Sequence, residues 1–104
     1  MKALKLEPEN GYFLDSLAWI YYKQGRYKEA LGKMQTAVRN IPPDPVVLEH
    51  LGDIYAAVGD LASAAGAYER SLKAESDDER EVDREPVRKK LSETRRKLKE
   101  GAGK

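Results

Sequence analysis

The chain repeats itself after 34 residues, and this repeat limits the possible folds more than any other feature. A shift of the sequence by 34 positions places like residues on one another: Leu14 on Leu48, Leu17 on Leu51, Ile20 on Ile54, Tyr21 on Tyr55, Gly25 on Gly59, Ala30 on Ala64 and Gly32 on Gly66. The same step aligns Ala3-Leu4 with Ala37-Val38 and Ser71-Leu72, so the chain is expected to begin inside a third copy. A unit this short cannot bury its apolar face alone, and we therefore expect the copies to stack around a shared core.

Each copy divides into two helices. Leu14, Leu17, Ala18 and Tyr21 recur at the spacing of one helical stripe, and Gly25 is expected to end that helix. A second helix is predicted from Tyr27 to about Asn40, before Pro42 and Pro43. The second copy carries the same signals, which are Asp44 as N-cap, Pro45 at the first helical position, Gly59 as the break, Asp60 as the next N-cap, and a helix to about Ala74.

This pattern resembles the tetratricopeptide repeat, a 34-residue helix-turn-helix unit. The residues that carry the resemblance are Leu17, Ala18, Tyr21, Gly25, Ala30 and Pro42 in the first copy and Leu51, Gly52, Tyr55, Gly59, Ala64 and Tyr68 in the second. Leu14 and Leu48 stand where the family often has Trp, Met34 replaces an aromatic residue, and Ser76 replaces the final Pro. The resemblance implies an all-α fold, a right-handed superhelical stack of antiparallel helix pairs.

The resemblance also predicts how the chain is divided. Repeats are expected at 11–44 and 45–78, and residues 1–9 are expected to be the second helix of an incomplete repeat. On this basis we expect the chain to be the C-terminal piece of a longer, bacterial repeat protein. The edge that the missing partner helix would leave uncovered predicts weak self-association.

Beyond the second copy the charge changes abruptly. Residues 75–83 hold six acids and one base, whereas residues 84–104 hold nine bases and three acids. Val87, Leu91, Thr94 and Leu98 form one narrow apolar stripe in the basic part. We therefore predict an acidic linker at 79–85, a basic capping helix at 86–100 that covers the last repeat, and a flexible tail at 101–104.

Composition excludes several classes of function. The chain has no cysteine and one histidine, so we expect neither a metal site nor a cofactor, and the sequence shows no nucleophile motif or phosphate-binding glycine loop. No apolar run approaches the length of a membrane span. We therefore predict a soluble chain that is not an enzyme, with the cytoplasm favoured for this segment, although a lack of cysteine fits other compartments too.

In proteins that this chain resembles, the first helix of each pair lines a concave groove that binds a peptide or a partner's helix. Transferred to this sequence, the lining residues are Tyr12, Asp15, Trp19, Tyr22 and Lys23 in the first copy and Glu49, His50 and Asp53 in the second, with Val46 and Ala56. Aromatic and acidic side chains together suit a protein or peptide ligand that carries apolar and basic residues. Alternatively, Trp19 and Tyr22 pack against the preceding copy, and the acids are solvated helix charges.

Three other functions can be compared with this groove. One subset of the family holds a terminal carboxylate with Lys, Arg and Asn, but Asp15, Glu49 and Asp53 would repel it. The basic helix is an alternative binding site for nucleic acid or an anionic surface, although no aromatic residue is interleaved for base stacking. In a third version this helix docks on the acidic groove of another copy.

Overall fold

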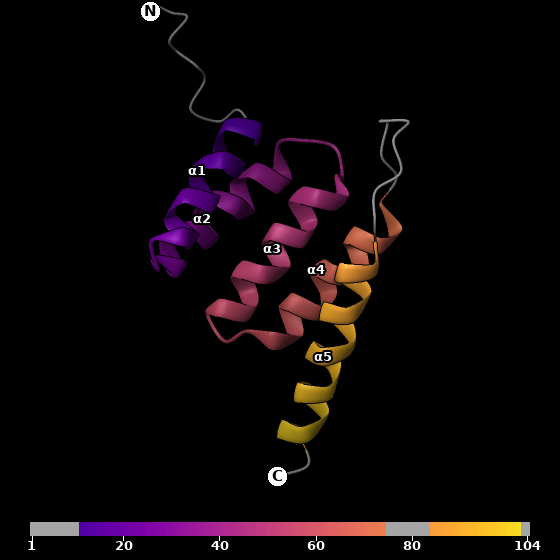
Figure 1. Cartoon of the computed structure of the whole chain (residues 1–104). Coiled ribbons are helices and arrows are strands. Elements are labelled where there is room, and N and C mark those ends of the chain that lie inside the picture. The colour runs from indigo at the N-terminus through magenta and orange to yellow at the C-terminus, as the bar shows by residue number, and fades with distance from the viewer. Residues whose placement is uncertain (1–10, 75–83, 103–104) are drawn as a thin grey trace, which may run out of the picture. The chain divides into compact units, whose positions relative to one another are not determined.

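The structure, a computed structural model, describes residues 11–74 and 84–102, and every regular element in these ranges is an α-helix (Figure 1). The helices are α1 (Gly11–Lys23), α2 (Tyr27–Arg39), α3 (Pro45–Ala57), α4 (Leu61–Lys73) and α5 (Glu85–Ala102). The predicted all-α class is confirmed. The chain divides into two compact units, Met1–Pro42 with α1 and α2, and Pro43–Lys104 with α3, α4 and α5.

The first unit is a helix pair whose turn depends on Gly25. Gly25 has φ 80°, in the left-handed region that favours glycine, and the following amide of Arg26 donates to the Tyr21 carbonyl at 2.9 Å. The predicted helix break is therefore confirmed. Small residues lie inside the pair, where Ala18 and Ala30 are fully buried together with Met34.

The second unit begins with a helix pair that repeats this plan. The Asp44 carboxylate caps α3 by accepting hydrogen bonds from the amides of Val46 (2.9 Å) and Val47 (3.1 Å), and Pro45 follows it. Gly59 has φ 92° and ends α3, and Asp60 caps α4 through the Ser63 amide at 3.1 Å. The caps and the break predicted from the sequence are all confirmed.

The α3–α4 contact is close because position 52 has no side chain. A Cβ added at Gly52 would lie 2.6 Å from Cδ1 of Tyr68, a residue that is 3% exposed. Ser71 also fixes the pair, since its buried hydroxyl donates to the Pro45 carbonyl at 2.7 Å. These two contacts set the distance between α3 and α4 at the middle and at one end of the pair.

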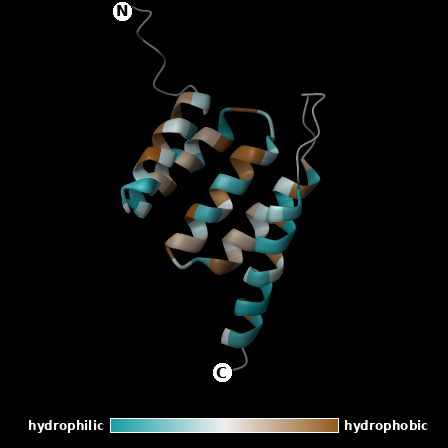
Figure 2. Ribbon diagram, viewed as in Figure 1, coloured by the Kyte–Doolittle hydropathy of each residue, from teal (hydrophilic) through white to brown (hydrophobic). Residues whose placement is uncertain are grey.

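The predicted capping helix is present as α5, which packs on α4. Val87 and Leu91 join Ala64, Ala65 and Tyr68 in one buried cluster. Thr94 is also buried and Leu98 is half-buried, which confirms the stripe, while most of the remaining α5 surface is hydrophilic (Figure 2). α5 thus presents one apolar face to its own unit and charged side chains elsewhere.

The bounds of α5 differ slightly from those expected. The helix begins at Glu85 and continues through Gly101 to Ala102, so two residues assigned to a flexible tail are helical. Helix ends commonly shift by one or two residues, because the last turns have few tertiary contacts to fix them. Residues 1–9, most of the acidic linker and residues 103–104 lie outside the described residues, so the predictions for them, like the repeat limits, stay predictions.

α5 repeats half of the α3 pattern at a spacing of 40 residues. Val87, Leu91 and Thr94 correspond to Val47, Leu51 and Ile54, and all six side chains are buried. In contrast, Arg88 and Ser92 are exposed, whereas the corresponding Leu48 and Gly52 are buried. α5 therefore resembles the first helix of a further repeat on one face only. The face that Leu48 and Gly52 bury in α3 is exposed in α5.

Candidate functional site

The predicted site residues of the first unit lie along α1. Tyr12, near the start of the helix, is 55% exposed, and Asp15 is half-buried. The Trp19 and Tyr22 rings stack, with centroids 4.6 Å apart and an interplanar angle of 16°. The structure therefore brings the two predicted aromatic residues into direct contact.

This stack continues onto α2 through Tyr27. The Tyr22 and Tyr27 rings are tilted at 55° with centroids 5.5 Å apart, and we call Trp19, Tyr22 and Tyr27 the aromatic ladder. The Lys23 ammonium lies 5.8 Å from the Trp19 ring centroid, a cation–π distance. Lys23 thus lies beside the Trp19 ring, and Tyr27, which the sequence marked only as the start of a helix, joins the predicted aromatic residues.

The turn after α1 is held by a second cation–π contact. The Arg26 guanidinium lies 4.4 Å from the Tyr21 ring centroid and forms two hydrogen bonds with the Glu29 carboxylate, at 2.6 and 2.7 Å. The hydrogen bond from Arg26 lowers the pKa of Glu29. These contacts fix the entry into α2, which carries Tyr27.

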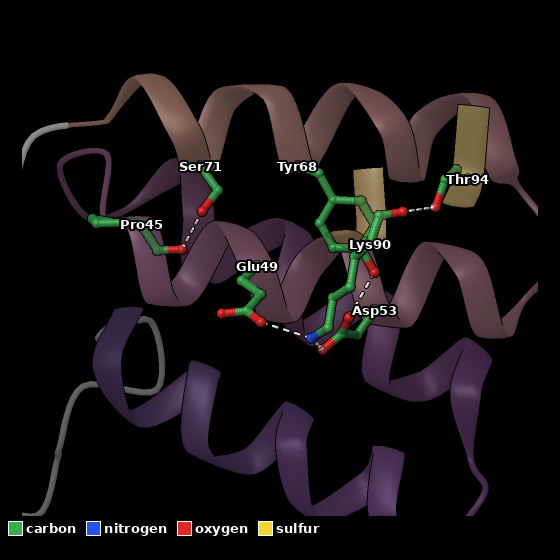
Figure 3. Close-up of polar contacts among 7 residues, drawn as sticks. All are labelled: Pro45, Glu49, Asp53, Tyr68, Ser71, Lys90 and Thr94. Carbon is green, nitrogen blue, oxygen red and sulfur yellow. Dashed lines mark hydrogen bonds and ion pairs between the residues drawn. The ribbon is translucent and has the colours of Figure 1, made fainter. Parts of the chain in front are cut away.

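In the second unit, the predicted site residues Glu49 and Asp53 lie one turn apart on α3, and we call them the carboxylate pair. Lys90 of α5 reaches both carboxylates (Figure 3), with its Nζ 2.6 Å from Glu49 Oε2 and 3.1 Å from Asp53 Oδ2. The Tyr68 hydroxyl donates to the other Asp53 oxygen at 2.6 Å. One ammonium group therefore bridges two acids that the sequence predicted to contact a ligand.

The environment of Lys90 keeps it charged. Partial burial lowers its pKa, but the hydrogen bonds to Glu49 and Asp53 and their negative charges outweigh this effect, so that the pKa is raised above its usual 10.5. The side chains of Lys90, Glu49 and Asp53 are 36%, 24% and 14% exposed. The cluster is thus partly screened by solvent, and we expect it to contribute modestly to stability.

His50 lies next to Glu49 in the sequence and is half-buried. Among the described residues, no group of three or more His, Cys, Asp or Glu side chains is arranged to hold a metal ion. The cation that the carboxylate pair contacts in this structure is the Lys90 ammonium.

Sequence reasoning missed two basic residues, in and just before α5, that contact the α3–α4 pair. Lys90 is one of the nine bases of residues 84–104, and no sequence signal distinguished it from the others. Arg84, just before α5, donates to the Leu72 carbonyl at 2.7 Å and to the Ala74 carbonyl at 2.9 Å. Basic side chains commonly satisfy the free carbonyls at a helix C-terminus, and this preference was the available signal for Arg84.

Several other basic side chains of α5 also have acidic partners. Arg95 pairs with Glu69 of α4, Arg88 with Glu85 at 3.0 Å, and Arg96 with Glu100 at 3.2 Å. These ion pairs partly neutralise the helix that was considered for binding nucleic acid. Within the described residues, no helix has the length and apolar character needed to cross a bilayer.

Comparisons with known proteins agree with the helix pairs. Residues 16–95 match the profile of a family described as a tetratricopeptide repeat-like domain. A TPR repeat-containing protein of Pseudomonas aeruginosa is 40% identical over 53 residues, which are 51% of this chain but only 9% of that relative. A domain of this kind implies, in general, a scaffold for protein–protein interaction. Because the profile covers most of the chain, including all of α2, α3 and α4 and parts of α1 and α5, this protein belongs to the tetratricopeptide repeat-like family.

Proposed function

We propose that this chain is a non-enzymatic interaction module that binds a peptide or a partner's helix through the first helices of its repeats. The aromatic ladder carries the proposal. Trp19 and Tyr22 are half-buried and stacked on α1, and Tyr12 of the same helix is 55% exposed. Tyr27, on α2, is 39% exposed. Pre-stacked rings offer large contact areas at low entropic cost, which is why aromatic residues dominate binding hot spots.

The chemistry of the first helices suits a ligand with apolar and basic side chains. Asp15 lies one turn before Trp19 on α1, and Glu49 and Asp53 supply negative charge on α3. In the first unit, Asp15 would select Lys or Arg on the ligand, while the ladder would contact its aromatic or aliphatic residues. In the second unit, the carboxylate pair would select a basic side chain.

The proposal is tested by selecting phage-displayed peptides on the whole chain and measuring their affinity for two variants. Trp19→Ala removes the first ring of the ladder, and Ile20→Ala is the matched control, because Ile20 is the next residue of α1 and is 53% exposed. We expect Trp19→Ala to weaken binding by about tenfold or more and Ile20→Ala to leave it within about twofold. Equal affinity of both variants, each with a normal thermal melt, would contradict the role of the ladder.

Weak self-association is a second candidate, favoured by two exposed apolar residues of α1. Phe13 and Ile20 are 49% and 53% exposed, whereas their counterparts 34 residues later, Val47 and Ile54, are 4% and 0% exposed. The test is the molar mass at high protein concentration by sedimentation equilibrium. A rise in mass that Ile20→Lys abolishes would support this candidate, and a constant monomer mass would remove it.

A further inference from the structure

We propose that Lys90 is a built-in competitor for the carboxylate pair, so that a lysine of a bound peptide contacts Glu49 and Asp53 only after the Lys90 side chain has swung away. The inference rests on the proposed function, because it specifies how the acidic part of the binding surface is regulated. It assigns to α5 a role in ligand selection in addition to covering α4.

The first support is that Asp53, one member of the carboxylate pair, is oriented independently of Lys90. Glu49 and Asp53 both project from α3, and the Tyr68 hydroxyl holds one oxygen of Asp53 at 2.6 Å. Tyr68 itself is fixed, because the residue is 3% exposed and its ring packs against Gly52. A ligand would therefore find Asp53 already oriented when Lys90 leaves.

The second support is that α5 has separate anchors. Val87 and Leu91 are buried against α4, and Arg84 binds two carbonyls at the end of α4. Lys90, in contrast, is 36% exposed and holds the acids only through the end of a long, flexible side chain. Rotation of that side chain can open the carboxylate pair while α5 stays docked.

The third support is the balance of charge and the geometry of the occupant. A single ammonium faces two carboxylates, at 2.6 and 3.1 Å, so the cluster keeps an excess negative charge that attracts another cation. An ammonium is a compact charge with three donors, and a ligand's lysine can reproduce both contacts in place of Lys90. The present occupant thus indicates the chemistry of the ligand group that would replace it.

The competition has a measurable consequence. The apparent dissociation constant of a ligand is its intrinsic value divided by the fraction of protein with a vacant site. If Lys90 fills the pair for about four-fifths of the time, its removal strengthens binding of a lysine ligand about fivefold.

The experiment uses the whole chain and a fluorescein-labelled peptide, acetyl-Phe-Lys-Trp-Lys-Phe-amide, with a second probe in which norleucine replaces both lysines. Binding is measured by fluorescence anisotropy for the native chain, Lys90→Met and Lys89→Met. Lys89→Met is the matched control, since it removes the same charge from the exposed neighbouring position of α5. We expect Lys90→Met to bind the lysine peptide about fivefold more tightly than the native chain, and Lys89→Met to match the native chain.

The other outcomes separate the two proposals. Equal affinity of the native chain and Lys90→Met overturns the competition but leaves the binding function intact, as does an equal gain for the norleucine peptide. Failure of every form of the chain to bind either peptide overturns both. Addition of Glu49→Gln and Asp53→Asn to Lys90→Met should abolish the gain, and its persistence would also overturn the competition.

A measurement on the native chain covers the case in which Lys90→Met does not fold. The Lys90 ammonium is observed by ¹⁵N NMR while the lysine peptide is added. Displacement of Lys90 from the acids predicts a shift and faster proton exchange of this signal at saturation. An unchanged signal with the peptide bound would contradict the competition.

Discussion

At the scale of single residues, the close packing of α3 on α4 depends on Gly52, which has no side chain. The Tyr68 ring occupies the space that a Cβ would need, and from there its hydroxyl reaches Asp53. One glycine therefore serves both the close packing of two helices and the orientation of an acid. Gly66 lies on α4, in contrast, and an added Cβ would meet nothing within 4 Å.

This difference predicts opposite effects of the same substitution. Gly52→Ala should lower the free energy of unfolding by about 1–3 kcal/mol, because the new methyl group displaces the Tyr68 ring. Gly66→Ala should raise it by up to about 1 kcal/mol, since alanine restricts the unfolded chain and favours the helix. Urea unfolding of the two variants beside the native chain measures both effects, and a Gly52→Ala variant as stable as Gly66→Ala would contradict the close contact.

The charge of Lys90 predicts a loss of stability at high pH. Its pKa in the folded chain is raised above 10.5, so its contribution to stability is fully present below that value and is lost as the pH rises through the folded pKa. The measurement is the urea midpoint of the native chain and of Lys90→Met from about pH 9 to 12. The effects of the other titrating groups are common to both proteins, so they cancel in the difference between the two midpoints. The difference between the two should shrink above about pH 10.5, and a constant difference would argue against the ion pair.

At the scale of helices, α5 is attached to its unit mainly by apolar contacts. Its buried face consists of Val87, Leu91 and Thr94, and the Thr94 hydroxyl is satisfied by the Lys90 carbonyl at 2.7 Å. Isolated polar helices are marginal in water, so this narrow face and the Arg84 contacts determine whether α5 stays docked.

Removal of one buried side chain should therefore loosen α5. Leu91 is 6% exposed, and Leu91→Ala should cost about 2–5 kcal/mol of unfolding free energy. Leu98→Ala, at a half-buried position of the same stripe, is the control and should cost less. Hydrogen exchange is the measurement, with faster exchange of α5 amides expected for Leu91→Ala, and equal protection of α5 in both variants would show that other contacts hold it.

At the scale of the whole molecule, charge is balanced and much of the basic helix is paired. The net charge is +1, and Arg88, Arg95 and Lys90 each contact at least one carboxylate. Affinity for a polyanion depends on cations that can replace its counterions, so these ion pairs work against binding of nucleic acid.

The whole chain should consequently bind a fluorescein-labelled oligonucleotide weakly even at about 50 mM salt. Glu69→Gln with Glu85→Gln releases Arg95 and Arg88 and should produce a measurable, salt-dependent increase in affinity. Fluorescence anisotropy at two salt concentrations tests this. Tight binding by the native chain would instead favour the nucleic-acid alternative.

The sequence by itself determined the helices, their caps and most core positions, because these depend on neighbours within a few residues. The 34-residue period, the glycines at 25 and 59, the caps at 44 and 60 and the α5 stripe could all be predicted. The spacing of Trp19 and Tyr22 placed both residues on one face of a helix, and the structure added that their rings stack. A shift of 40 residues would also have shown that α5 repeats part of α3.

Only the tertiary structure decided what the acids contact. Lys90 lies 41 residues from Glu49 and 37 from Asp53, and Tyr68 lies 15 residues from Asp53. No local pattern selects Lys90 from the other bases of α5, because the choice depends on how the helix is rotated on α4 and how far a flexible side chain reaches. The sequence thus located the charged and aromatic residues, and packing determined which of them meet.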